Sequence, residues 1–136
     1  MTIVIDSSVV VAALVDDGRD GSWAREGLGA DELVAPAHLF VEVSSVLRRA
    51  VLTDRLGRDA AALAHRDLAD LPVTVFPFEP LADRVWDLHP TVTPYDAAFV
   101  ALAEELDVPL WTLDRRLARS SGPRCAFHLP GSPEHG

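Results

Sequence analysis

The chain has 136 residues, a length that favours one domain with a single core, and 49% of its residues are apolar, which excludes wholesale disorder. Its net charge of −9 argues against broad, non-specific binding to nucleic acid. It does not exclude a nucleic-acid enzyme, because carboxylates that hold a divalent metal make the formal charge more negative and the bound metal reverses the local field. All 12 basic residues are Arg, which excludes P-loop ATPases and Schiff-base enzymes because both require Lys.

A single cysteine, Cys125, excludes an internal disulfide and a cysteine-based zinc site, and it fits a reducing compartment. The chain starts directly with the apolar residues 3–5, without the basic segment that opens a secretory signal. No apolar run approaches the length that spans a bilayer. We therefore expect a cytoplasmic protein with no membrane partner.

Strand-like and helix-like patterns alternate through the first half of the chain. β-branched runs indicate buried strands, and apolar residues at helical spacing indicate amphipathic helices. In chain order, the predicted elements are a strand over residues 2–6, a helix over 9–14, a short helix over 23–28, a strand over 33–35, a long helix over 37–52 and a helix over 59–70.

The second half continues the alternation. Thr93 is a predicted N-cap, Pro94 fits the first helical position, and Asp96 falls three residues after the cap. The predicted elements are a strand over residues 73–76, a helix over 80–88, a helix from 93 to about 107, a strand over 110–113, a short helix over 115–119 and an edge strand over 124–127. This order predicts an α/β fold, with a central parallel sheet between helices on both faces. Residues 1–128 form the predicted domain and residues 129–136 a flexible tail.

Four acidic residues stand out by position: Asp6, Glu42, Asp96 and Asp114. Each also has an ordinary explanation. Asp6 and Asp114 each precede a predicted helix and would cap it, Asp96 would complete a capping box with Thr93, and Glu42 would be a solvated residue on a long helix.

Considered together, the four acids predict a shared site. Asp6 and Asp114 follow strands that end at the same edge of a parallel sheet, Asp96 opens the helix before the second of those strands, and Glu42 lies one turn into another helix near that edge. Unpaired carboxylates at low dielectric repel one another by several kcal/mol. A divalent cation would resolve this repulsion.

The chemistry of the four side chains favours one class of metal and reaction. A set of oxygen ligands without His or Cys indicates Mg²⁺ or Mn²⁺ rather than Zn²⁺. Such a site suits hydrolysis of phosphate esters. We expect Asp6 and Asp96 to be the direct ligands, while Glu42 and Asp114 would complete a second site, hold waters or accept a proton. Ser7 and Thr112 add neutral oxygens that would orient a carboxylate or satisfy the backbone.

Three segments resemble the PIN domain, and more narrowly the VapC-type toxins of bacterial toxin–antitoxin pairs. They are IVIDSSVVVAAL at residues 3–14, FVEVSSVLRRA at 40–50 and TPYDAAFVALAEELDVPLWTLDRRL at 93–117. The most specific part is YDA with its Ala-rich helix, followed by an apolar strand that closes in T-x-D. The resemblance covers residues 2–127, and Ser7 stands where this family often has Thr or Ala.

The resemblance implies a three-layer α/β/α fold and a metal-dependent endoribonuclease. The family's acids correspond to Asp6, Glu42, Asp96 and Asp114, Thr112 is the hydroxyl of T-x-D, and Asp6 and Asp96 would hold Mg²⁺. It further implies cleavage of structured RNA such as tRNA or rRNA, a homodimer, and inhibition by a small cognate antitoxin.

RNA contacts on an acidic protein are expected at local basic groups. Arg115, Arg116 and Arg119 directly follow Asp114 and are the candidates, with Ser7 beside the first acid; solvated helix charges explain the three arginines about as well.

Two other classes of protein compete with the nuclease. One is a catalytically inactive PIN-like module that binds a protein, against which the complete set of four acids argues. The other is a phosphoryl-transfer domain of the receiver or haloacid-dehalogenase type. Both of those families rely on a Lys, which this chain lacks, and a haloacid-dehalogenase also needs a second acid where Ser8 stands.

Overall fold

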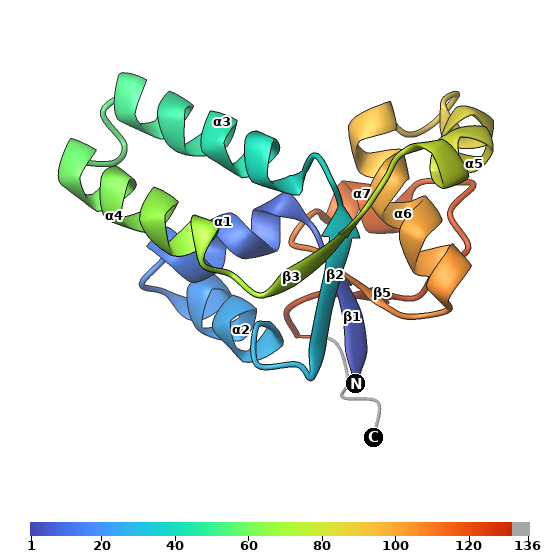
Figure 1. Ribbon diagram of the computed structural model, residues 1–136, viewed down its shortest axis with the longest axis horizontal. Helices are drawn as coiled ribbons and strands as arrows, with labels where there is room; N and C mark the ends of the chain where they lie inside the picture. The colour runs from blue at the N-terminus through green and yellow to red at the C-terminus, as the bar shows by residue number, and fades with distance from the viewer. Residues whose placement is uncertain (132–136) are drawn as a thin grey trace.

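The computed structural model describes residues 1–131, which form one central sheet flanked by helices (Figure 1). All five strands are parallel and lie in the order β3–β2–β1–β4–β5. The strands are β1 (Thr2–Ile5), β2 (Glu32–Pro36), β3 (Val73–Phe76), β4 (Leu110–Trp111) and β5 (Phe127–His128). The predicted parallel α/β sheet is therefore confirmed.

Helices cover both faces of this sheet. They are α1 (Ser7–Val15), α2 (Arg19–Gly27), α3 (Leu39–Leu52), α4 (Arg58–Ala69), the 3₁₀ turn η1 (Glu79–Leu81), α5 (Ala82–Leu88), α6 (Pro94–Leu106) and α7 (Arg115–Arg119). Figure 1 shows α1 to α4 on one side of the sheet and α5 and α6 on the other, which gives three layers.

The strand order reverses beside β1. The chain runs outward from β1 to β2 and β3, then crosses back to place β4 on the other side of β1. Main-chain hydrogen bonds lock this junction, because Val4 N donates to Pro109 O at 3.0 Å and Asp6 N donates to Trp111 O at 3.2 Å. Such a reversal leaves a crevice beyond the carboxyl ends of the strands, where open α/β sheets bind ligands.

The core consists of the inner strands and the apolar faces packed on them. Helix α6 is buried along most of its length and contacts both β1 and β2. The largest fully buried side chains are those of Phe99, Ile3, Ile5, Leu39, Leu68, Leu88, Leu102 and Leu110. A strand with neighbours on both sides and helices on both faces is buried and needs a continuous apolar run. β1 and β4 are such inner strands, and their pairing places their carboxyl ends side by side.

Several predicted boundaries need correction. Helix α2 begins at Arg19 instead of 23, because the break after α1 is only three residues long. Strand β4 stops at Trp111 instead of 113, since Thr112 turns its hydroxyl to accept from Asp114 N at 3.0 Å. The edge strand β5 occupies 127–128 instead of 124–127. The predicted tail, residues 129–136, lies outside the described residues from 132 onward.

Within residues 1–131, no helix combines the length and apolar character needed to cross a membrane.

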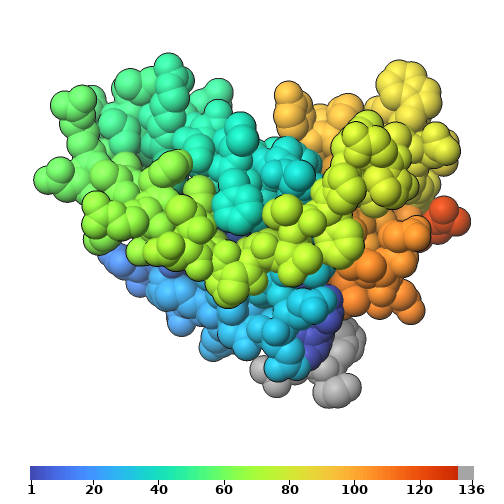
Figure 2. Space-filling model, in the orientation of Figure 1, coloured from blue at the N-terminus to red at the C-terminus, as the bar shows by residue number. Residues whose placement is uncertain are grey.

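The space-filling view shows a notch at the top of the molecule, between α3 and the segment of α5 and α6 (Figure 2).

Candidate active site

The four predicted acids line one cavity of about 530 Å³ at the carboxyl edge of the sheet. One part of its wall is acidic and another is apolar. We call it the acid cavity, and its lining is Asp6, Ser7, Ser8, Val11, Ala12, Val15, Asp16, Glu42, Val46, Asp96, Leu113 and Asp114. Residues separated by up to 108 positions in the chain thus meet because β1 and β4 are neighbours and α3 and α6 begin at the same edge.

Asp6 sits at the end of β1 and is buried, with 6% of its surface exposed. Its Oδ1 accepts from Val9 N at 3.2 Å, which makes it the N-cap of α1, and from Ser8 Oγ at 2.5 Å. Burial raises the pKa of Asp6 to about 6, against the hydrogen bonds from Ser8, Thr112 and Val9. The capping role and the place in the cavity are therefore both correct.

Glu42 reaches the cavity from the first turn of α3 and is half-buried. Ser7 Oγ donates to its Oε1, which ties α3 to the start of α1. His38 lies one turn earlier, with its Nε2 4.0 Å from Glu42 Oε2 and 3.1 Å from Tyr95 O. Glu42 is thus held by neighbours within the site, so the solvated-residue interpretation is wrong.

Asp96 enters from the first turn of α6. Its main-chain N donates to Thr93 Oγ1 at 3.4 Å, as predicted for the N-cap. Burial raises the pKa of Asp96, and the charges of Glu42 and Asp114 raise it further. Glu42 and Asp114 therefore each lie close enough to Asp96 to disfavour its charged form.

Asp114 follows β4 and caps α7, because its Oδ1 accepts from Arg116 N at 3.0 Å and from Leu117 N at 3.1 Å. Thr112 is fully buried, accepts from Asp114 N, and contributes a hydrogen bond to Asp6. The hydroxyl of T-x-D thus connects the acids that follow β1 and β4.

Two residues at the site were not identified from the sequence. Ser8 contacts Asp6 and accepts from Leu113 N at 3.0 Å, and His38 links Glu42 to the main chain of α6. The only sequence signal for Ser8 was its place in Asp6-Ser7-Ser8. His38 gave none, since its partner Tyr95 is 57 positions away.

The arginine candidates follow Asp114 on α7 and are not among the residues that line the acid cavity. Arg115, Arg116 and Arg119 are exposed on α7, and the guanidinium of Arg115 donates to Pro130 O at 3.2 Å. Among residues 1–131, no arginine forms a salt bridge with any of the four acids. Their mutual repulsion is therefore not relieved by arginine side chains of residues 1–131, and the nearest basic group is the imidazole of His38, 4.0 Å from Glu42.

The donor set fits a hard divalent cation. In residues 1–131, no three Asp, Glu, His or Cys side chains are already arranged to hold a metal together. Mg²⁺ does not require such a cage, because it keeps several waters and is commonly held by one or two carboxylates and the phosphates of a substrate. Asp6, with its burial and raised pKa, and Asp96, with two acidic neighbours, are the groups that a cation would stabilise most.

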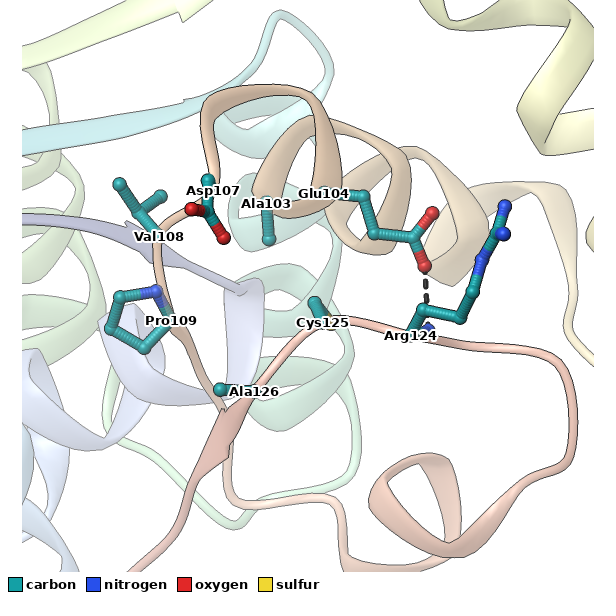
Figure 3. Close-up of a pocket in the computed structure, with 8 residues that line it drawn as sticks. All are labelled: Ala103, Glu104, Asp107, Val108, Pro109, Arg124, Cys125 and Ala126. Atoms are coloured by element: carbon teal, nitrogen blue, oxygen red, sulfur yellow. Dashed lines mark hydrogen bonds between the residues drawn. The ribbon is translucent and has the colours of Figure 1, made fainter.

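A second pocket, of about 430 Å³, lies at the amino edge of β4 and β5 (Figure 3). We call it the Cys125 pocket, and its lining is Ala103, Glu104, Asp107, Val108, Pro109, Arg124, Cys125 and Ala126. Glu104 is paired here: Arg84 Nε donates to its Oε1 at 2.7 Å, and Arg124 N donates to its Oε2 at 2.7 Å. Burial alone would raise the pKa of Glu104, but these partners outweigh it and lower the pKa.

Comparison with known proteins identifies the family. The chain matches the PIN domain over residues 3–122. It is 41% identical over 127 residues to ribonuclease VapC1 of Mycobacterium tuberculosis, covering 93% of this chain and 96% of that protein. Solved structures share the fold. The VapC20 toxin of Mycobacterium tuberculosis, described as cleaving the sarcin–ricin loop, has a TM-score of 0.65 at 20% identity and covers 85% of this chain and 92% of its own.

A second solved structure, VapBC-5 of Mycobacterium tuberculosis, is described as a member of the VapBC family of toxin–antitoxin systems. It has a TM-score of 0.55 at 20% identity and covers 94% of this chain and 96% of its own. Sequence identity above a third over nearly the whole length, together with the matching family and fold, decides the assignment. The chain belongs to the PIN-domain family, among the VapC ribonucleases.

Proposed function

We propose that this protein is a cytoplasmic endoribonuclease that depends on Mg²⁺ or Mn²⁺ and acts as the toxin of a toxin–antitoxin pair. One observation carries the proposal: four carboxylates from four separate segments line one cavity, and no arginine of residues 1–131 pairs with them. Membership of the VapC group supports RNA as the substrate.

The roles of the residues follow from their positions. Asp6 and Asp96 would hold the cation, which when bound supplies Lewis-acid polarisation of the phosphate and neutralises its charge. Glu42, which Ser7 holds in the wall of the cavity, and Asp114 would complete a second cation site, hold waters or accept a proton from the attacking water. Asp114 and Thr112 hold the end of β4 against Asp6 and keep the acids together.

Structured RNA, such as tRNA or rRNA, is the proposed substrate class. Arg115, Arg116 and Arg119 are exposed on the helix that Asp114 caps, and they would contact phosphates of the bound strand, with Ser7 near the reacting group. Changing all three arginines to Ala should weaken RNA affinity at least tenfold and move the melting temperature by only a few degrees. Filter binding at two salt concentrations and thermal unfolding measure the two effects.

A small cognate antitoxin is the proposed protein partner, and a homodimer the proposed assembly. The toxin–antitoxin description of VapBC-5 supports the first. The apolar wall of the acid cavity, formed by Val11, Val15, Val46 and Leu113, offers a partner buried contact area. Analytical ultracentrifugation of the protein, alone and with the product of the neighbouring gene, tests both.

The decisive experiment is cleavage of total RNA by purified protein, with Mg²⁺ or with EDTA. Asp96→Asn removes one charge with little change of shape and should abolish cleavage while leaving the fold intact, because it disrupts the proposed cation site. Asp107→Asn is the matched control: it makes the same change at the exposed carboxyl end of α6 and should cleave at the parental rate.

Cleavage by Asp96→Asn at the parental rate, or full cleavage in EDTA, would reject the proposed site. A parent that binds an antitoxin but cuts no RNA would instead establish the inactive binding module.

A further inference from the structure

Ser8 occupies a junction between two distant parts of the acid cavity. Its hydroxyl donates to Asp6 Oδ1 at 2.5 Å and accepts from Leu113 N at 3.0 Å, across 105 positions of sequence. We propose that Ser8 is a positioning residue: it orients the Asp6 carboxylate and ties it to the segment that carries Asp114. The inference rests on the proposed function in that the positioned group is a cation ligand.

The hydroxyl uses its hydrogen-bonding capacity in both directions. A serine has one proton to donate and lone pairs to accept with. Here the proton is committed to Asp6 and a lone pair to the main chain of Leu113, so neither partner depends on solvent at this point. Main-chain bonds between β1 and β4 end at Asp6 N and Trp111 O. Ser8 extends that junction by one further link, beyond the last paired residues of the sheet.

Ser7 and Ser8 hold different acids. Ser7 Oγ points to Glu42 on α3, and Ser8 Oγ points to Asp6 and the turn after β4. Successive residues at the start of a helix project about 100° apart, so two adjacent serines reach two separate segments. The pair therefore connects the start of α1 with both α3 and the Leu113–Asp114 turn.

Groups that orient a metal ligand affect the metal even though they do not touch it. Replacing such a partner costs typically 10–100-fold in metal affinity. A rotating Asp6 would have to be ordered when the cation binds, whereas one held by Ser8 is ordered beforehand. Ser8→Ala should therefore weaken the binding of Mn²⁺ about tenfold and lower the cleavage rate in subsaturating metal.

The test compares three variants by calorimetric titration with Mn²⁺. Ser8→Ala removes the hydroxyl, and Ser8→Thr keeps it at a position that lines the cavity. Ser44→Ala is the matched control, since Ser44 is also a half-buried helix serine whose hydroxyl has two partners, Phe40 O at 2.9 Å and His65 Nε2 at 2.8 Å. We expect parental affinity in Ser44→Ala and affinity within about threefold of the parent in Ser8→Thr.

Amide hydrogen exchange provides a readout that needs neither metal nor RNA. Loss of the acceptor in Ser8→Ala should accelerate exchange at Leu113 N without accelerating it in the core of α6. Unchanged exchange at Leu113, or equal loss of Mn²⁺ affinity in Ser8→Thr and Ser8→Ala, would overturn the inference. If the parent neither binds Mn²⁺ nor cuts RNA, the proposed function fails, and the exchange at Leu113 still decides whether Ser8 makes the tie.

Discussion

The acid cavity lies at the carboxyl ends of the strands and the Cys125 pocket at their amino ends, and the carboxylates of the two pockets have opposite electrostatic environments. Glu104 accepts a hydrogen bond from the main-chain amide of Arg124 (Figure 3). It also accepts from the Arg84 guanidinium, and these partners lower its pKa. Asp6 is buried with only hydroxyl and amide donors, and its pKa is raised to about 6. A carboxylate that is paired stabilises the fold, whereas carboxylates gathered without cations have a cost that a bound ligand can repay.

The largest expected effect comes from neutralising the buried acid. Asp6→Asn should lower RNA cleavage about a hundredfold or more, because it removes a proposed cation ligand. Glu104→Gln makes the same chemical change at the other edge and should leave the cleavage rate within about twofold of the parent. Initial rates on one RNA substrate at saturating Mg²⁺ measure both. Equal losses of cleavage rate in the two variants would show that the acid cavity and the Cys125 pocket do not differ in function.

The pH dependence of stability should differ between the edges. Because the pKa of Asp6 rises from 3.8 to about 6 on folding, the folded chain holds a proton that the unfolded chain releases. The free energy of unfolding from this group is therefore highest below about pH 4 and falls by about 3 kcal/mol as the pH rises to about 6.

Urea unfolding without metal, across that range, checks this sign. Asp6→Asn should lack the decline, so its stability relative to the parent should increase with pH. Glu104 acts in the opposite direction, since its lowered pKa gives stability above its unfolded value that is lost as the pH falls. Parallel curves for parent and Asp6→Asn would contradict the burial argument.

Removing the paired acid, Glu104, should lower the stability of the fold and leave RNA cleavage unchanged. Glu104→Ala leaves the half-buried Arg84 without its carboxylate and should cost about 1–3 kcal/mol of unfolding free energy. Cleavage should be retained in the folded fraction. Denaturant unfolding of Glu104→Ala and of Glu105→Ala, an exposed neighbour on α6, separates the paired contact from a generic loss of charge.

The smallest expected effect concerns Cys125. Burial, and then the charge of Glu104, raise the pKa of this thiol to about 11, so only about a thousandth of it is thiolate at pH 8. Alkylation by iodoacetamide should be slow, and Glu104→Gln should accelerate it a few-fold by removing the nearby charge. Mass spectrometry of timed samples measures the rate. Rapid labelling of the parent would show that the pocket does not shield the thiol.

The sequence predicted the alternation of elements and the gathering of four acids because both depend on regular features. Apolar periodicity indicates where the strands and helices lie. In a parallel sheet the carboxyl ends of the strands lie on the same side, so acids that follow different strands come together. The capping explanations of Asp6 and Asp114 were also correct, since one side chain can bond the first turn of a helix and still face a cavity. These two interpretations were not alternatives.

The contacts that the sequence did not predict join residues that are far apart in the chain. The bond between Ser8 and Leu113 exists only after β1 has paired with β4, and His38 approaches Tyr95 only after the starts of α3 and α6 have come together. Short edge elements were misplaced for a related reason. Strand β5 has only two residues, and its register is set by pairing with β4 and not by its own pattern.

The position of β4 has a consequence for how the protein is made. It inserts between β1 and β5, although β1 is translated first and β4 more than a hundred residues later. A nascent chain that stops before residue 110 lacks β4, one of the two strands that flank β1, and lacks Asp114, an acid of the cavity. Products that terminate before this strand would therefore be unable to assemble the acid cavity.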